Sequence, residues 1–217
     1  MKTMTQENLN VDLPRWFRRD PTVGVSLVDA EMRIQFVNDR AVEMFLAEGA
    51  KVEAGQSLWE LFPEPWVKER QDLVRRVLET DEPLALRSIR RGVRIQSTFY
   101  PVHDEDDKPT SVLVFSVPGE TAVRKEQDGM EIVESGIVDL GDLDRLTRRE
   151  IEVLALMGHG MGRLEIAEKL YRSPKTVDNH MASIGGKLGV ANRAELVQIA
   201  TRAGLKLGHA DLPRTHE

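Results

Sequence analysis

The sequence of 217 residues contains no cysteine, which excludes disulfide bonds, thiolate nucleophiles, zinc fingers and thiolate-ligated iron. It also has no run of roughly 18 apolar residues, the length that a membrane-spanning helix needs, and residues 1–10 lack the apolar stretch of a signal peptide. We therefore expect a cytoplasmic protein without a membrane partner. A Ser-His-Asp order, a glycine-rich phosphate loop and an HExxH motif are missing as well, so we do not expect an enzyme.

The charges that are present divide the chain in two. Residues 145–206 carry 11 Lys and Arg against 6 Asp and Glu, whereas residues 1–144 carry 18 against 28. Phosphate binding depends on Lys and Arg, so the net charge of -6 would argue against nucleic acid if it were spread evenly. The length suits two modest domains, and the asymmetry predicts a basic binding module behind an acidic regulatory one.

The first part of the chain alternates strand-like and helical patterns. A short lead helix is expected within residues 1–20, closed by Pro21. The following elements are expected to be two strands, two short helices, one longer helix and three strands, at 23–28, 33–37, 38–46, 57–62, 65–79, 84–90, 93–102 and 111–117. On the longer helix an apolar stripe faces the core, with Arg and Glu over the remainder. This order predicts an α+β domain with an antiparallel sheet over residues 21–117.

In residue pattern this domain resembles the PAS fold. The resemblance rests on Asp29, Ala41, Phe45, Lys108 and the runs 33–38, 55–58, 61–63, 99–106 and 111–115. It implies a sensory or dimerisation domain, and two interpretations stay open. The interior could hold an unidentified small ligand, or it could be filled by side chains such as Phe36, Phe45, Leu58, Trp59 and Phe99. We predict no cofactor, because no cysteine could form a flavin adduct and the long helix has no histidine for haem iron.

Two further segments complete this half of the chain. The acidic turn 103–107 could suggest a metal site, but it lacks the alternate spacing and glycine of a cation loop, so we predict no metal. A phosphate-accepting receiver domain is disfavoured, because no apolar strand ends in an aspartate at the required place. Residues 118–144, acidic and rich in glycine, predict a linker with one short ordered piece near 137–143, and residues 208–217 predict a C-terminal tail.

The last third of the chain carries the strongest helix signals. Thr147 and Glu150 form a capping box, and the helix that starts there ends at Gly158. A second helix is expected at 165–171, and Ser173 with Pro174 starts a third, whose apolar residues Val177, Met181, Ile184 and Leu188 share one face. Asn192 caps a fourth helix that ends near Gly204. An all-α domain of four helices is therefore predicted over residues 145–207.

The motifs of this domain resemble the LuxR (GerE) helix-turn-helix family. They are Leu146-Thr147, Arg149-Glu150, Glu152-Val153-Leu154, Glu165-Ile166-Ala167, Ser173-Pro174-Lys175-Thr176-Val177, Asn179-His180, Lys187-Leu188-Gly189-Val190, Asn192-Arg193 and Glu195-Leu196. The resemblance implies a recognition helix over 175–187 that enters the major groove of double-stranded DNA. The last helix commonly provides a dimer contact in this family, so a homodimer is expected.

The residues implied for DNA binding lie opposite the apolar face of the third helix. By the resemblance, Asp178, Asn179 and Ala182 face bases, while Lys175, Thr176, His180 and Lys187 touch phosphates or support the helix. Ser183 flanks the same face. Together these eight residues form the predicted DNA-binding site.

Two departures from the family pattern weaken this expectation. Gly162 stands where the family usually has Ser or Thr, so the second helix lacks its customary cap. Gly185 and Gly186 lie inside the recognition helix, where two glycines cost roughly 2 kcal/mol relative to alanine. We expect weaker DNA affinity, or a shorter or bent recognition helix. The alternative to a transcription regulator is therefore a non-catalytic interaction module that titrates partners without reading DNA.

Overall fold

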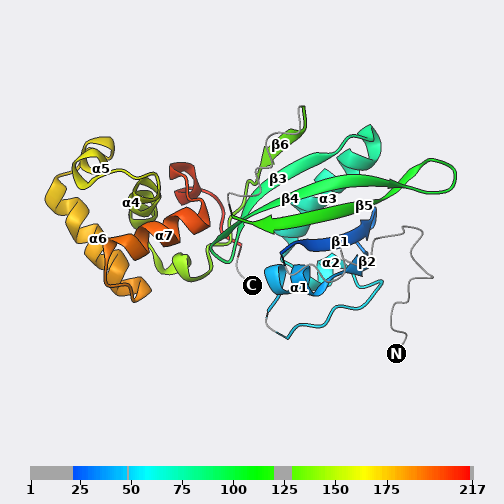
Figure 1. Cartoon of the computed structure of the whole chain (residues 1–217), viewed down its shortest axis with the longest axis horizontal. Helices are drawn as coiled ribbons and strands as arrows, with labels where there is room; N and C mark the ends of the chain where they lie inside the picture. Colours follow the sequence, from blue (N-terminus) through cyan, green and yellow to red (C-terminus); the bar gives the residue numbers. More distant parts are fainter. Residues whose placement is uncertain (1–21, 48, 120–128, 216–217) are drawn as a thin grey trace.

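The computed structural model describes residues 22–47, 49–119 and 129–215, so the predicted lead helix lies outside the described residues. Two domains lie side by side along the long axis of the molecule (Figure 1). The first contains β1 (Gly24–Asp29), β2 (Ile34–Val37), α1 (Asp39–Phe45), α2 (Leu58–Leu61), α3 (Glu64–Thr80), β3 (Leu84–Arg90), β4 (Val93–His103), β5 (Pro109–Pro118) and β6 (Glu131–Glu134). The predicted α+β domain is confirmed, with most ends within two residues of those expected.

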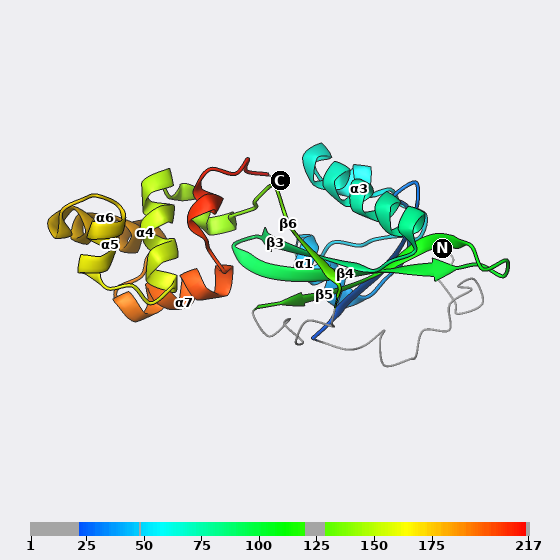
Figure 2. The same cartoon turned by 90° about the horizontal axis from the view of Figure 1, so that it is seen from above.

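The sheet has the strand order β2-β1-β5-β4-β3-β6. The first five strands are antiparallel, as predicted, but β6 pairs in parallel with β3, which makes the sheet mixed. Helix α3 lies across one face of this sheet (Figure 2). The main core of the domain, which includes Val67, Val77, Leu86, Phe99 and Val112, lies between α3 and that face.

Asn38 shows how a single side chain sets the geometry of the first elements. It is 4% exposed, and its Oδ1 accepts hydrogen bonds from the backbone N–H groups of Val25 and Ala41, both at 2.9 Å. One carbonyl oxygen therefore caps α1 and anchors that helix to β1. The predicted helix start at Asn38 is confirmed.

The segment predicted as a linker is only partly one. Residues 131–134 form β6, and beyond them the backbone N–H of Val138 donates to the carbonyl of Pro213 at 2.9 Å. The N–H of Thr215 in turn donates to the carbonyl of Val138. A short 3-10 helix (Leu207–Ala210) spans the boundary between the predicted helical domain and the predicted tail, and the tail then pairs with the chain between the domains. The amino-acid composition could not predict this pairing, because each of the two segments is ordered by contacts with residues that are distant in the sequence.

The second domain consists of four helices, as predicted, preceded by a 3-10 turn (Gly141–Arg145). They are α4 (Arg148–Gly158), α5 (Arg163–Lys169), α6 (Pro174–Leu188) and α7 (Arg193–Ala203). Their shared core includes Ile151, Leu154, Ile166 and Ile184, and Ile89 from β3 also packs into it. The helical core is therefore continuous with the C-terminal end of β3.

Helix α5 begins at Arg163, two residues earlier than predicted. Its N-cap is Gly162, which has no side chain to offer, but Glu165 Oε2 accepts a hydrogen bond from the Gly162 backbone N–H at 2.5 Å. Half of a capping box therefore survives the departure from the family pattern. Within the described ranges, no helix has the length and apolar character needed to cross a membrane.

The two glycines of α6 have different surroundings. The helix runs unbroken to Leu188, so the expectation of a shorter recognition helix is wrong. A Cβ built on Gly185 would lie 2.8 Å from the carbonyl oxygen of Val190, whereas one on Gly186 meets nothing within 4 Å. Val190 N–H donates to the carbonyl of Gly185 at 2.9 Å, the bond that closes the helix end. Gly185 is required by this close approach, and Gly186 is not.

We expect opposite effects from alanine at the two positions. Gly186→Ala should stabilise the protein by about 0.5–1 kcal/mol, because alanine loses less backbone freedom on folding. Gly185→Ala should destabilise it by about 1–3 kcal/mol, because the new methyl group would push against the Val190 carbonyl. Urea unfolding followed by far-UV circular dichroism checks both, and equal effects of the two substitutions would contradict the difference in packing.

Candidate DNA-binding surface and interior cavity

Helix α6 is held in place by its N-cap and by one buried face. Ser173 Oγ accepts from the Thr176 N–H at 3.1 Å and lies 2.9 Å from Thr176 Oγ1, so the predicted Ser-Pro helix start is confirmed. Val177, Ile184 and Gly185 are buried against the other helices. Thr176 was predicted to touch a phosphate or to support the helix, and its hydroxyl is engaged at the N-cap.

The opposite face of α6 is open. Lys175, Asn179, Ala182 and Gly186 are exposed and follow one another at helical spacing, which we call the α6 row. Among the described residues, the side chains of Lys175 and Asn179 have no hydrogen-bond partner. Long polar side chains at one end and small residues at the other leave this row free to approach a partner.

Two of the predicted residues are occupied within the chain. Ser183 Oγ donates to Glu150 Oε1 at 2.6 Å, and Lys187 Nζ lies 2.7 Å from Glu150 Oε2. The same carboxylate accepts from the Thr147 N–H at 2.7 Å. The sequence predicted a capping-box role for Glu150, and the structure shows that its carboxylate also holds the C-terminal half of α6 against α4. Lys187 was predicted to touch a phosphate or to support the helix, and these contacts fit the supporting role.

These bonds tie the stability of the helical domain to pH. Burial alone would raise the pKa of Glu150, but hydrogen bonds from Lys187, Ser183 and Thr147 outweigh it and lower the pKa from 4.5 to about 2. The stabilisation is present above the unfolded value of 4.5 and is lost as the pH falls through about 2. Between pH 4.5 and about 2, we expect the free energy of unfolding to fall less in the Glu150→Gln variant than in the parent. Parallel curves of unfolding free energy against pH for the two proteins would contradict this role of Glu150.

The remaining predicted residues lie beside the α6 row. Asp178 forms an ion pair with Arg163 of α5 at 3.0 Å, so this predicted base contact is partly engaged. His180 faces a shallow groove that is otherwise lined by Arg148, Arg149, Glu152 and Arg172. Arg172 is exposed at the turn before α6 and was not predicted, although its position next to Ser173 could have suggested it. The groove adds a basic flank to the α6 row.

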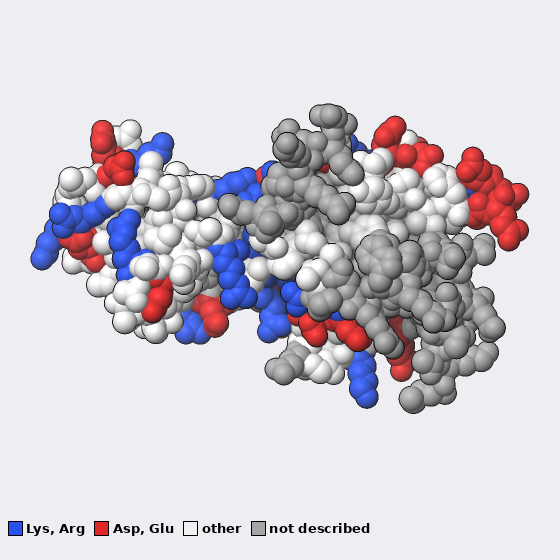
Figure 3. Space-filling view, in the orientation of Figure 1, with Lys and Arg blue, Asp and Glu red and all other residues white. Residues whose placement is uncertain are grey.

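The surface charges follow the two domains. Figure 3 shows Lys and Arg side chains spread over the helical end of the molecule, with several Asp and Glu among them, and a group of acidic residues at the far end, where Figure 1 places the β4–β5 turn. In that turn Asp104 Oδ1 accepts the N–H groups of Asp106 and Lys108, at 3.0 and 3.1 Å. Among the described residues, no group of three or more His, Asp and Glu could hold a metal ion.

The first domain contains an interior cavity of about 80 Å³. One water occupies roughly 10–15 Å³ on the same scale, so the cavity has room for several waters or a small molecule. Its walls come from the helices and the inner face of the sheet, and include Phe45, Leu58 and Phe99. Two other residues expected in the core are elsewhere, because Phe36 packs on the opposite face of the sheet and Trp59 is 41% exposed.

Known proteins match both domains. Residues 144–200 match the family described as bacterial regulatory proteins, luxR family, and residues 22–118 match the PAS fold. The chain joins a PAS-fold domain to a LuxR-family domain. Both resemblances predicted from the sequence are therefore confirmed.

Individual relatives match the LuxR-family domain. The transcriptional regulatory protein LnrK of Bacillus subtilis is 47% identical over 62 residues, which are 29% of this chain and 28% of LnrK. The oxygen regulatory protein NreC of Staphylococcus aureus is 47% identical over 60 residues, 28% of each chain. The chain thus matches less than a third of the length of these curated relatives.

A solved structure is similar in fold over both domains. It is the VqmA protein of Vibrio cholera in a complex with ligand and DNA, and the match spans 92% of this chain and 91% of the VqmA chain. The identity is 22% and the TM-score is 0.51. This likeness concerns the fold, in which a PAS-fold domain precedes a LuxR-family domain.

Proposed function

We propose that the protein is a transcription regulator whose LuxR-family domain binds operator DNA and whose PAS-fold domain senses a signal or mediates dimerisation. The observation that carries the proposal is the α6 row, an exposed helix face of basic, polar and small residues opposite a buried one. A major groove has room for one such helix. The names of LnrK, a transcriptional regulatory protein, and of the VqmA complex with DNA support the same function.

The proposal assigns roles to the predicted site. Asn179 and Ala182 face bases, with Asp178 beside them, while Lys175, His180 and Arg172 lie toward phosphates. Thr176, Ser183 and Lys187 hold the helix in its orientation. The protein acts in the cytoplasm as a non-enzymatic homodimer on a pseudo-palindromic operator, and a signal changes the alignment of the two recognition helices.

The experiment is a selection of duplexes from a random pool by the full chain, followed by affinity measurements at several salt concentrations. We expect the logarithm of the binding constant to fall linearly with that of the salt concentration, because Lys and Arg displace counterions from phosphates. The selected duplex should bind more tightly than the pool at every concentration.

A second candidate function is an interaction module that titrates a protein partner. The observation in its favour is Gly186, which leaves the end of the α6 row without a side chain for a phosphate. Failure of the full chain to bind any duplex at low salt would contradict the regulator and favour this module.

A further inference from the structure

The cavity of the PAS-fold domain has polar groups in an otherwise apolar wall. Ser26, Ser97 and Ser116 line it from the sheet, and the hydroxyls of Ser97 and Ser116 lie 2.8 Å apart. Arg70 of α3 lines it from the opposite side, and of the described lining residues it alone carries a charge. The described wall therefore combines an apolar surface with three hydroxyl groups and one guanidinium group.

Arg70 is buried but only partly satisfied. Its side chain is 8% exposed, and its Cζ lies 4.1 Å from the centre of the Trp66 ring. Both of its hydrogen bonds involve Nη1, to Glu69 Oε2 at 2.6 Å and to the Trp66 carbonyl at 3.4 Å. Among the described residues, nothing accepts a hydrogen bond from Nε or Nη2. Burial lowers the pKa of Arg70 to about 10, and the neighbouring Glu69, which raises it, offsets this only in part.

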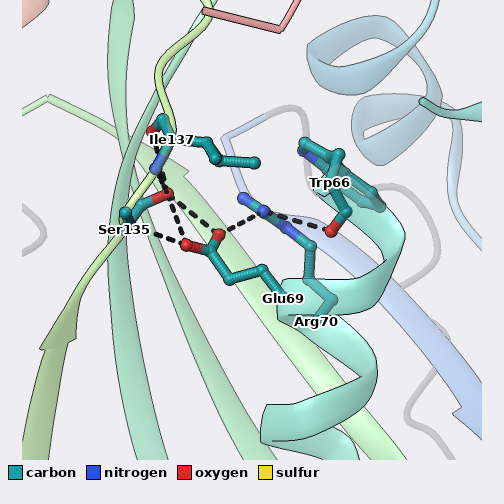
Figure 4. Close-up of polar contacts among 6 residues, drawn as sticks. Trp66, Glu69, Arg70, Ser135 and Ile137 are labelled. Carbon is teal, nitrogen blue, oxygen red and sulfur yellow. Dashed lines mark hydrogen bonds and ion pairs between the residues drawn. The ribbon is translucent and has the colours of Figure 1, made fainter. Parts of the chain in front are cut away.

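The carboxylate that pairs with Arg70 is shared with the segment between the domains. Glu69 accepts hydrogen bonds from Ser135 Oγ at 2.9 and 3.0 Å and from the Gly136 N–H at 2.7 Å (Figure 4). Ser135 Oγ is also 2.9 Å from the carbonyl of Ile137. Part of the negative charge next to Arg70 is thus used to hold residues 135–137.

We propose that this cavity binds a small, largely apolar monoanion of roughly ten non-hydrogen atoms or fewer, whose charged group lies on Arg70 and whose body lies among Phe45, Phe62 and Phe99. This inference rests on the sensing role proposed above and names the chemical class of the signal. A guanidinium group with free N–H donors suits a carboxylate, and the aromatic walls suit an apolar body. Among the described residues that line the cavity there is no Asp or Glu to repel an anion.

The position of Arg70 also indicates how occupancy reaches the other domain. An anion on the guanidinium competes with Glu69, and Glu69 holds the segment that leads into the LuxR-family domain. Ligand binding therefore alters the balance of contacts at Ser135 and Gly136. In this arrangement Arg70, which contacts the anion, and Glu69, which holds the segment between the domains, are consecutive residues of α3.

The test measures binding of benzoate, cyclohexanecarboxylate and hexanoate to the full chain by calorimetry and thermal shift at neutral pH, each beside its neutral amide. We expect at least one acid to bind at least tenfold more tightly than its amide, and Arg70→Met to abolish the preference. Arg70→Lys should retain part of it. The matched control is Arg75→Met, an arginine on the same helix whose side chain is 62% exposed, and it should change nothing.

Three results would overturn the proposal: equal binding of acids and amides, no binding of any acid at millimolar concentration, or an unchanged preference in Arg70→Met. If Arg70→Met fails to fold, the comparison of acid with amide in the parent and in Arg70→Lys still decides. Binding is measured without DNA, so failure here leaves the DNA-binding function standing, and loss of DNA binding leaves this result standing.

Discussion

Replacing Arg90 with methionine should lower the free energy of unfolding by about 3–5 kcal/mol, because it leaves a buried carboxylate without its partner. Arg90 Nη1 lies 2.7 Å from Asp139 Oδ2, and the side chains are 3% and 9% exposed. Arg90 Nη2 also donates to the carbonyl of Phe45 at 2.6 Å. The pair joins the sheet of the PAS-fold domain to the chain that enters the LuxR-family domain.

The backbone around Asp139 strengthens the connection. Its N–H donates to the carbonyl of Ile89 at 3.1 Å, and its carbonyl accepts from the Gly92 N–H at 3.0 Å. Its second carboxylate oxygen accepts from the Gly141 N–H at 3.0 Å. Loss of Arg90 should therefore disturb the contact between the domains as well as the stability of the first one.

The measurement uses the distribution of tryptophan. Trp16, Trp59 and Trp66 all precede the LuxR-family domain, so fluorescence reports on the N-terminal part while far-UV circular dichroism includes the helices. In Arg90→Met the two urea transitions should separate. The control is Arg87→Met on the same strand, whose partner Glu134 lies 3.7 Å away and is 47% exposed, so the loss should stay below about 1 kcal/mol.

Removing both charges provides the second control. Arg90→Met combined with Asp139→Asn should recover part of the loss, since no unpaired charge remains and the amide oxygen can still accept from Gly141. An Arg90→Met protein as stable as Arg87→Met would show that the buried pair does not hold the domains together.

Much of this architecture could be predicted from sequence because its signals are local. Asn38, Thr147, Ser173 and Asn192 each start a helix where the pattern placed it, since a capping side chain acts on backbone groups two or three residues away. Strand alternation and the ordered LuxR motifs likewise need no knowledge of distant contacts. These local features were enough to predict the fold class of both domains.

The features that were missed depend on contacts between distant residues. Strand β6 pairs with β3 over 40 residues away, and Lys187 reaches Glu150 on another helix. Arg70 was counted among the polar residues covering α3. It lies three residues after Val67 and four before Val74, within the apolar stripe, and this spacing could have revealed its burial.

Alanine at Asn179 should cost about 1–3 kcal/mol of discrimination between the selected operator and other duplexes at each half-site. Asn179 stands in the middle of the exposed α6 row, and a bidentate amide on a base edge is specific to that base. Competition binding of the full chain to selected and random duplexes measures the effect. Affinity for random duplexes should change little, because their binding depends on phosphates.

Lys175 supplies the matched comparison, since it lies one turn earlier in the same row. Lys175→Ala should weaken binding to all duplexes alike and reduce the salt dependence by about one unit per half-site. Lys51→Ala, an exposed lysine of the PAS-fold domain, is the control for a general loss of charge. If Asn179→Ala and Lys175→Ala both bound like the parent, the α6 row would not be the face that meets DNA. If both instead reduced affinity uniformly, the helix would contact the phosphate backbone without reading bases.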